Sequence, residues 1–234
     1  MRLALSCIAL LIPGTALAEE VAVEKPPADK PAAPAPSTDA DAEGADAPAA
    51  WETADAEHRG GFTVGLAVAP GLGAANGFPG DSKKIGRERY YTESGLGFAP
   101  SSSLWIGGAF VDWLTFGVGA GFSTVLTEDT RTPSPLILFH TDVYPLYALG
   151  GPLRNLGAMT EFGLGYAETK NTETEEVLID GPGASYLFVG GFWEGIEAWK
   201  LKMGPYTGFH YLFSQTIRRP VLAVGFRISL YTLP

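Results

Sequence analysis

The sequence predicts an all-β protein: an eight-stranded antiparallel up-and-down transmembrane β-barrel, preceded by a disordered tether of proline, alanine and acidic residues. Three observations lead to this fold class. The chain begins like an exported protein, the next segment is too polar and proline-rich to fold, and the remainder alternates large apolar residues with small ones. We expect three parts: a signal peptide at 1–18, a periplasmic linker at 19–58 and an outer-membrane barrel at 59–234.

The first 18 residues have the pattern of a secretory signal peptide. A charged start is followed by the apolar residues 3–12, and a small-x-small cleavage site ends at Ala18. The apolar run is far short of the roughly 20 residues that a transmembrane helix needs. We expect cleavage after Ala18, which would also remove Cys7, the only cysteine. The mature chain would then have no disulfide and no thiolate metal ligand.

Residues 19–58 differ in kind from the rest of the chain. They hold eleven aspartates and glutamates against two lysines, and Trp51 is their only aromatic residue. Such a segment cannot bury enough apolar surface to offset the entropy of ordering, so we expect an extended linker, with a docking tail as the alternative. From residue 59 onward there are 13 basic and 15 acidic residues. The acidity therefore belongs to the linker, and no basic surplus indicates nucleic-acid binding.

From residue 60 onward, large apolar side chains alternate with small or polar ones. In the first segment Phe62, Val64 and Leu66 are separated by threonine and glycine, and residues 114–126 and 222–230 repeat the pattern. A period of two residues indicates β-strands. The side opposite the large residues is mostly glycine, alanine, serine and threonine. A soluble barrel would place lysine and glutamate there, so we expect this side to line a narrow lumen and the large residues to face lipid.

Eight such segments are expected, and an even number of strands brings both chain ends to the periplasmic side. The predicted strands lie near 60–72, 95–111, 113–126, 135–146, 155–168, 184–193, 199–213 and 219–232. The longer connections would be extracellular, at 73–94, 127–134, 169–183 and 214–218. The shorter ones would be periplasmic, at 112, 145–154 and 194–198.

Together these features resemble the small outer-membrane barrel superfamily, which includes OmpA-like and OmpX-like eight-stranded barrels. The resemblance covers residues 60–234 and rests on the signal peptide and on GFTVGLAVAPGLG, LTFGVGAGFSTV, LGAMTEFGLGYAE and VLAVGFRISLY. It implies location in a bacterial outer membrane, with lipid, lipopolysaccharide and the barrel-insertion machinery as partners. The chain departs from the family at its end, where Tyr-Thr-Leu-Pro replaces the terminal phenylalanine read by that machinery, and Tyr231 would partly stand in for it.

Charges on the small-residue side would point into the lumen. Because buried charges need partners, we expect a structural ion-pair network that fills the barrel, the alternative being a proton-linked or gated pore. Eight strands leave an interior that side chains fill, which argues against a diffusion channel. The residues expected in this network are Glu161, Arg227, Asp142, Lys202, His140 and His210.

Aromatic residues gather near the strand ends that this topology makes periplasmic. Rings with a polar edge prefer the membrane interface, so we expect a girdle there, although aromatic residues also favour strands in general. Trp105 does not fit this scheme. The expected members of the girdle are Trp113, Tyr144, Tyr147, Trp193, Trp199 and Tyr231.

Basic residues cluster in the first outer loop, and Arg131, Arg218 and Arg219 are predicted on neighbouring loops. Guanidinium and ammonium groups pair strongly with phosphate, so contacts with lipopolysaccharide are one reading of the cluster, and a solvated loop is the other. The loop residues concerned are Lys83, Lys84, Arg87 and Arg89.

No motif indicates a cofactor or a metal, since the GxG runs lie within strands and no ligand spacing is present. Some barrels of this family deacylate lipids with a Ser-His-acid set. Here Ser214 and His210 lie about 13 Å apart along a strand, too far for a direct hydrogen bond. We therefore expect a monomeric, non-enzymatic outer-membrane protein with a structural or surface-interaction role and a plugged lumen. A lipid A deacylase-like enzyme, and a narrow pore or small apolar-ligand carrier, stay open as alternatives.

Overall fold

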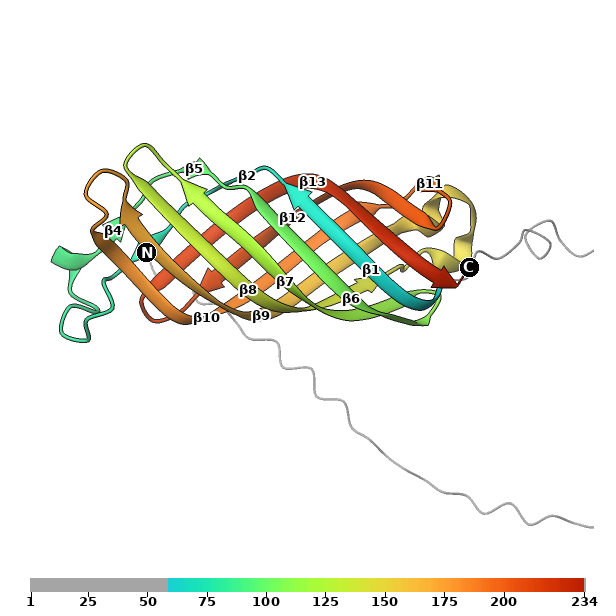
Figure 1. Ribbon diagram of the computed structural model, residues 1–234, viewed down its shortest axis with the longest axis horizontal. Helices are drawn as coiled ribbons and strands as arrows, with labels where there is room; N and C mark the ends of the chain where they lie inside the picture. Colours follow the sequence, from blue (N-terminus) through green and yellow to red (C-terminus); the bar gives the residue numbers. More distant parts are fainter. Residues whose placement is uncertain (1–58, 234) are drawn as a thin grey trace, which may run out of the picture. The chain divides into compact units, whose positions relative to one another are not determined.

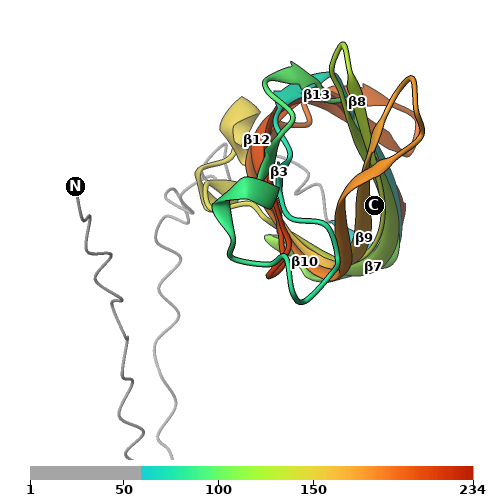
Figure 2. The same cartoon turned by 90° about the vertical axis from the view of Figure 1, so that its left-hand side faces the viewer.

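The computed structural model describes residues 59–233, and these form a closed ring of eight long antiparallel strands (Figures 1 and 2). Each strand pairs with the next in the chain, and the last, β13, closes the ring on β1. The eight strands are β1 (Gly60–Ala69), β6 (Ser101–Val111), β7 (Leu114–Leu126), β8 (Thr130–Val143), β9 (Leu156–Asn171), β10 (Val177–Trp193), β12 (Leu201–Phe213) and β13 (Ile217–Leu233). This ring confirms the predicted eight-stranded up-and-down barrel. The predicted signal peptide and linker lie outside the described residues.

Short elements extend the ring at its two ends, which we name by what they carry. The loop end carries the connections that follow β1, β7, β9 and β12, and the terminal end carries the other turns and the C-terminal end of β13 (Figure 1). The loop-end elements are β2 (Gly71–Gly73), β3 (Asn76–Gly77), η1 (Glu88–Tyr90), β4 (Thr92–Glu93) and β5 (Gly97–Phe98). The terminal-end elements are η2 (Tyr147–Leu149), η3 (Gly151–Asn155) and β11 (Ile196–Ala198).

Two predicted loops are too long, because strands run further toward the loop end than expected. β8 begins at Thr130 and β10 at Val177, inside the segments 127–134 and 169–183. Prolines hid the strand pattern in β8: Pro133 and Pro135 have no N–H to donate, and the pairing of β8 with β9 steps from Arg131 directly to Leu136. Across that gap the hydroxyls of Thr132 and Thr169 bond to each other at 2.9 Å.

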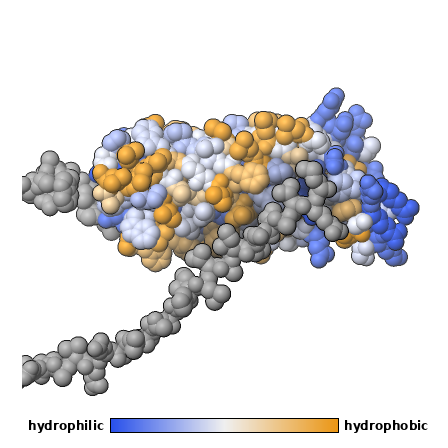
Figure 3. Space-filling view, turned by 180° about the vertical axis from the view of Figure 1, so that it is seen from behind, coloured by the Kyte–Doolittle hydropathy of each residue, from blue (hydrophilic) through white to orange (hydrophobic). Residues whose placement is uncertain are grey.

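The outside of the ring is apolar. Ile137 and Leu164 are 74% and 64% exposed, and Phe116, Phe139 and Phe162 stack side by side across β7, β8 and β9 with ring centroids 6.2 and 5.0 Å apart. Figure 3 shows hydrophobic residues along the sides of the barrel and strongly hydrophilic residues gathered at the loop end. Each ring strand has at least the roughly 9–11 residues that a tilted transmembrane strand needs. This is the exterior of a transmembrane barrel.

The inside of the ring is close-packed. Gly65 faces inward and leaves room for Trp105, whose atom Cζ2 lies 2.0 Å from where a Cβ on Gly65 would stand. Trp105 is 2% exposed and stacks on His140 with ring centroids 4.0 Å apart. The one tryptophan that did not fit the predicted girdle is thus a lumen residue. Within residues 59–233, no helix is long and apolar enough to cross a membrane.

Candidate functional site

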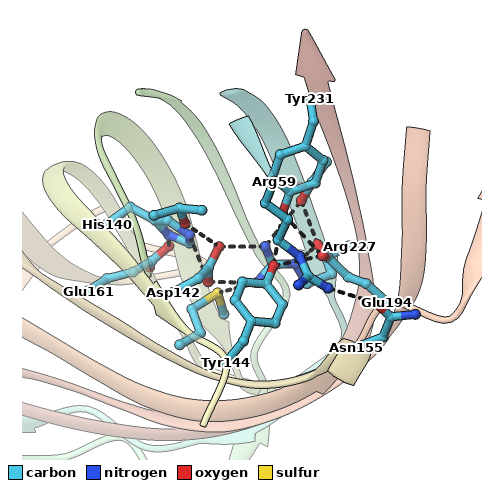
Figure 4. A network of polar contacts seen from close by, with 12 residues as sticks. Arg59, His140, Asp142, Tyr144, Asn155, Glu161, Glu194, Arg227 and Tyr231 are labelled. Carbon is cyan, nitrogen blue, oxygen red and sulfur yellow. Dashed lines mark hydrogen bonds and ion pairs between the residues drawn. The ribbon is translucent and has the colours of Figure 1, made fainter. Parts of the chain in front are cut away.

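In the lumen near the terminal end, an arginine is held between two acids (Figure 4). Arg227 of β13 donates from Nη1 and Nη2 to the two carboxylate oxygens of Asp142 on β8, at 2.8 and 2.7 Å. Its Nε lies 3.0 Å from Oε1 of Glu194, in the turn after β10, and its guanidinium lies 3.8 Å over the ring of Phe192. All three charged side chains are fully buried. Charges in such a place are stable only when paired this completely.

The cluster continues to a second acid through a histidine. His140 Nε2 lies 3.1 Å from Asp142 Oδ1, and its Nδ1 lies 3.0 Å from Glu161 Oε1. Ser103 and Tyr186 also donate to the Glu161 carboxylate, at 3.1 and 3.3 Å. Contacts from β6, β8, β9 and β10 therefore meet at Glu161, so the network links strands that are not neighbours in the ring.

At the terminal end, two tyrosines complete the cluster. Tyr144 and Tyr231 are 1% and 4% exposed, and both hydroxyls donate to Glu194 Oε2, at 2.7 and 3.2 Å. Their placement in a lipid-facing girdle was therefore wrong. Tyr144 lies an even number of residues from Asp142, and Tyr231 from Arg227, so both side chains point inward like those charges. Of the other predicted girdle residues, Trp113, Trp193 and Trp199 are 49%, 36% and 87% exposed.

Arg59, the first described residue, covers this cluster from the terminal end. Its Nη2 donates to Asn155 Oδ1 at 2.6 Å, and its guanidinium lies 3.7 Å over the ring of Tyr144. It also lies 5.8 Å from the ring of Tyr147, which is half-buried in η2 and packs against the buried cluster. Burial and the neighbouring Asp112 carboxylate raise the pKa of the Tyr147 hydroxyl, because both disfavour the phenolate.

Four of the six residues predicted for the lumen network meet in it: Glu161, Arg227, Asp142 and His140. Lys202 lies nearer the terminal end, where its Nζ is 3.4 Å from Glu197 Oε1 of β11. His210 is buried in the lumen, but neither ring nitrogen has a hydrogen-bond partner among the described residues. Glu194 and Arg59 are the functional residues that the sequence reasoning missed. For Glu194 the signal was present, since Phe192, Trp193 and Glu194 continue the alternation beyond the strand.

The basic residues at the loop end divide between surface and interior. Lys83, Arg87 and Arg89 are exposed, whereas Lys84 lies 4.0 Å from Asp81 and, like Arg89, approaches the Tyr90 ring. Three further arginines were predicted on outer loops, but all three lie in strands, and Arg218 is exposed near the start of β13. Arg131 lies in β8 and pairs with Glu175, and Arg219 lies in β13 and is 1% exposed inside the lumen.

Ser214 and His210 are not joined. Ser214 lies in the turn after β12, and its Oγ contacts Thr216 Oγ1 at 3.0 Å and accepts from the Thr216 N–H at 3.1 Å. His210 points into the lumen instead. The lumen cluster consists of buried charges that contact one another, and a cavity of about 20 Å³ beside Glu161 is lined by Ser103, Ser123, Tyr186 and His210 among others. That is room for about one water molecule.

Comparisons with known proteins give similarity of fold only. No protein-family model and no curated protein matches the chain. Among solved structures, Neisserial surface protein A is 13% identical, with a TM-score of 0.43 over 72% of this chain and 98% of that one. The attachment invasion locus protein Ail of Yersinia pestis is 9% identical, with a TM-score of 0.41 over 71% and 98%. The outer membrane protein OprG of Pseudomonas aeruginosa is 9% identical, with a TM-score of 0.38 over 76% and 99%.

Proposed function

We propose that this protein is an integral outer-membrane barrel with a structural or surface-interaction role, closed to diffusion and without enzymatic activity. The observation that carries the proposal is the cluster around Arg227, in which Asp142, Glu194 and Tyr144 fill the lumen section near the terminal end. The stacked Trp105 and His140 add a second filled layer. Small residues on the lumen side make room for these side chains, and we expect no continuous water path past them.

Conductance in planar lipid bilayers tests the closed lumen. We expect the full-length mature protein to show no stepwise channel currents, because paired side chains fill the lumen section near the terminal end. The comparison variant replaces Arg227, Asp142 and Glu194 together with alanine, which empties that section without leaving an acid there that has lost its arginine, and it is expected to raise ion flow. Regular open-channel steps in the wild-type protein would contradict the proposal.

The surface role is proposed to include phosphate groups of lipopolysaccharide. Exposed Lys83, Arg87 and Arg89 project from the connection between β3 and η1 and from η1 itself, at the end where hydrophilic residues gather (Figure 3). An arginine guanidinium can grip a phosphate with two hydrogen bonds, and a lysine acts as a point charge. Folding would depend on the barrel-insertion machinery, and the barrel would act as a monomer.

Binding of purified lipopolysaccharide to the detergent-solubilised protein tests this surface. Replacing Lys83, Arg87 and Arg89 with glutamine is expected to weaken binding about tenfold, since each exposed charge pair contributes up to about 1 kcal/mol. The control replaces Arg154 and Lys200, which are basic residues of the terminal end, and should leave binding unchanged. Equal affinity for dephosphorylated lipopolysaccharide would show that phosphate recognition plays no part.

A further inference from the structure

At the loop end, β13, β3 and β4 form a three-stranded antiparallel extension of the barrel wall (Figure 1). β3 pairs with β13 through Asn76, which lies opposite Arg218, and β4 pairs with the other edge of β3. The Phe78 N–H donates to the Thr216 carbonyl oxygen at 2.8 Å and continues the pairing into the turn before β13. Gly77 permits this close approach, because a Cβ there would collide with the same carbonyl oxygen. The extension is therefore held by its backbone and presents its side chains in fixed positions.

This extension carries a pocket of about 320 Å³, whose lining includes Asn76, Phe78, Tyr91, Gln215 and Arg218. The volume lies within the range of about 300–1,000 Å³ that is typical of small-molecule sites. The rings of Phe78 and Tyr91 contact each other, with centroids 5.1 Å apart and planes inclined at 59°. Tyr91 is 40% exposed, so part of its ring is open to a ligand. The pocket therefore combines an aromatic wall with polar side chains.

The polar side chains of the pocket are available for binding. Within residues 59–233, the side chains of Asn76, Gln215 and Arg218 form no hydrogen bond or ion pair with the protein. Amide and guanidinium groups are planar and can make two hydrogen bonds to one partner. Arg218 is the one charged residue in the lining. Glu93 lies opposite Asn76 on β4, two strands from Arg218, which is roughly 10 Å by strand spacing.

The pocket lies on the outward side of the wall, just beyond the apolar band. Leu222 and Val224 of β13 are 57% and 59% exposed on the barrel exterior. Arg218 precedes Leu222 by four residues, so it points to the same side and lies about 13 Å further toward the loop end. Lipid tails are expected to cover Leu222, and the head groups of the same leaflet would then surround the pocket.

We propose that this pocket binds one acidic sugar in the head group of an outer-leaflet glycolipid. The ring hydrogens of the sugar pack on Tyr91, and its neighbouring hydroxyls bond to Asn76 and Gln215. Arg218 pairs with the sugar carboxylate. The inference rests on the proposed contact between the loop end and lipopolysaccharide, but it uses none of the basic loop residues assigned to phosphate.

Saturation-transfer NMR on the full-length mature protein, in a detergent without sugar groups, tests the pocket. The probes are methyl glucuronide, which is acidic, and methyl glucoside, its neutral match. We expect saturable binding of the glucuronide, about fivefold tighter than that of the glucoside because only the acid pairs with Arg218. Arg218→Met should make the two affinities equal. Tyr91→Ala should weaken binding of both sugars at least about fivefold.

The controls change similar residues outside the pocket. Arg131→Met removes another arginine of the loop end, and Tyr90→Ala removes the neighbouring ring, and both variants should bind the glucuronide like the wild type. The glutamine variant of the three exposed basic loop residues should also bind it normally. Failure of the phosphate contacts would therefore leave this test intact.

The lipid origin of the sugar is tested with glucuronosyl diacylglycerol in the same micelles. It should bind at least as tightly as the methyl glucuronide, because its tails can lie against the apolar band. Weaker binding would assign the pocket to a soluble sugar and overturn the glycolipid. The proposal as a whole is overturned by the absence of saturable glucuronide binding or by equal wild-type affinity for the two methyl sugars. Unchanged binding in Tyr91→Ala or Arg218→Met would overturn it as well.

Discussion

Replacing Arg227 with methionine is expected to lower the free energy of unfolding by about 3–5 kcal/mol, the largest effect of any single substitution in the lumen. The change leaves Asp142 and Glu194 buried with one cation fewer between them, and neither carboxylate can reach water. Methionine fills much of the space left by the arginine side chain. The loss of unfolding free energy therefore reports the missing charge more than a new cavity. Urea titration of the barrel folded into phospholipid vesicles measures this loss of unfolding free energy.

Two variants separate this electrostatic effect from general damage to β13. Arg218→Met changes an exposed arginine in the same strand and should alter stability by less than about 0.5 kcal/mol. Arg227→Lys keeps the charge but loses the two-nitrogen contact with Asp142. Its loss of unfolding free energy should therefore lie between those of Arg218→Met and Arg227→Met. A loss below about 1 kcal/mol for Arg227→Met would mean that the cluster does not hold the barrel together.

The second large effect is expected from Gly65→Ala, which should lower the free energy of unfolding by about 1–3 kcal/mol because it overpacks the lumen. The new methyl group would stand 2.0 Å from Trp105 Cζ2, and the stacked ring of His140 restricts where the indole can move. The apparent unfolding midpoint, followed by the heat-dependent shift in gel migration, measures the loss. Gly191→Ala on the outer face is the control, since its methyl group would meet only Gly157 O, at 3.8 Å. Equal stability of the two variants would contradict the packed lumen.

Much of this architecture could be predicted from the sequence because a transmembrane barrel is built on a two-residue period. Alternation alone identified eight strands and the inward side of Glu161, Arg227, Asp142 and His140. It also predicts that Tyr144 and Tyr231 point inward, but the preference of tyrosine for membrane interfaces was given more weight. A local chemical preference is the weaker guide where the strand period is unbroken.

The rest depended on information that a single strand does not contain. Which acid meets Arg227 is set by the stagger of strands around the ring, so Glu194, in a turn far along the chain, was not identified. Pro133 and Pro135 made a strand resemble a loop, because a missing N–H is tolerated where a side-chain pair such as Thr132 with Thr169 bridges the gap. Arg219 was assigned to a loop because the last strand was expected to begin only at 219, whereas β13 begins at Ile217.

Lipid is expected to surround the apolar outside of this barrel, and Ile137 in the middle of β8 is the position at which to measure this. The experiment attaches a spin label to Ile137→Cys, in full-length protein with Cys7 replaced by serine, and reconstitutes it in phospholipid vesicles. Ile137 is 74% exposed on the barrel exterior. The label is expected to collide more often with oxygen, which concentrates in lipid, than with a water-soluble nickel complex. A preference for the nickel complex would place this face in water and contradict the account.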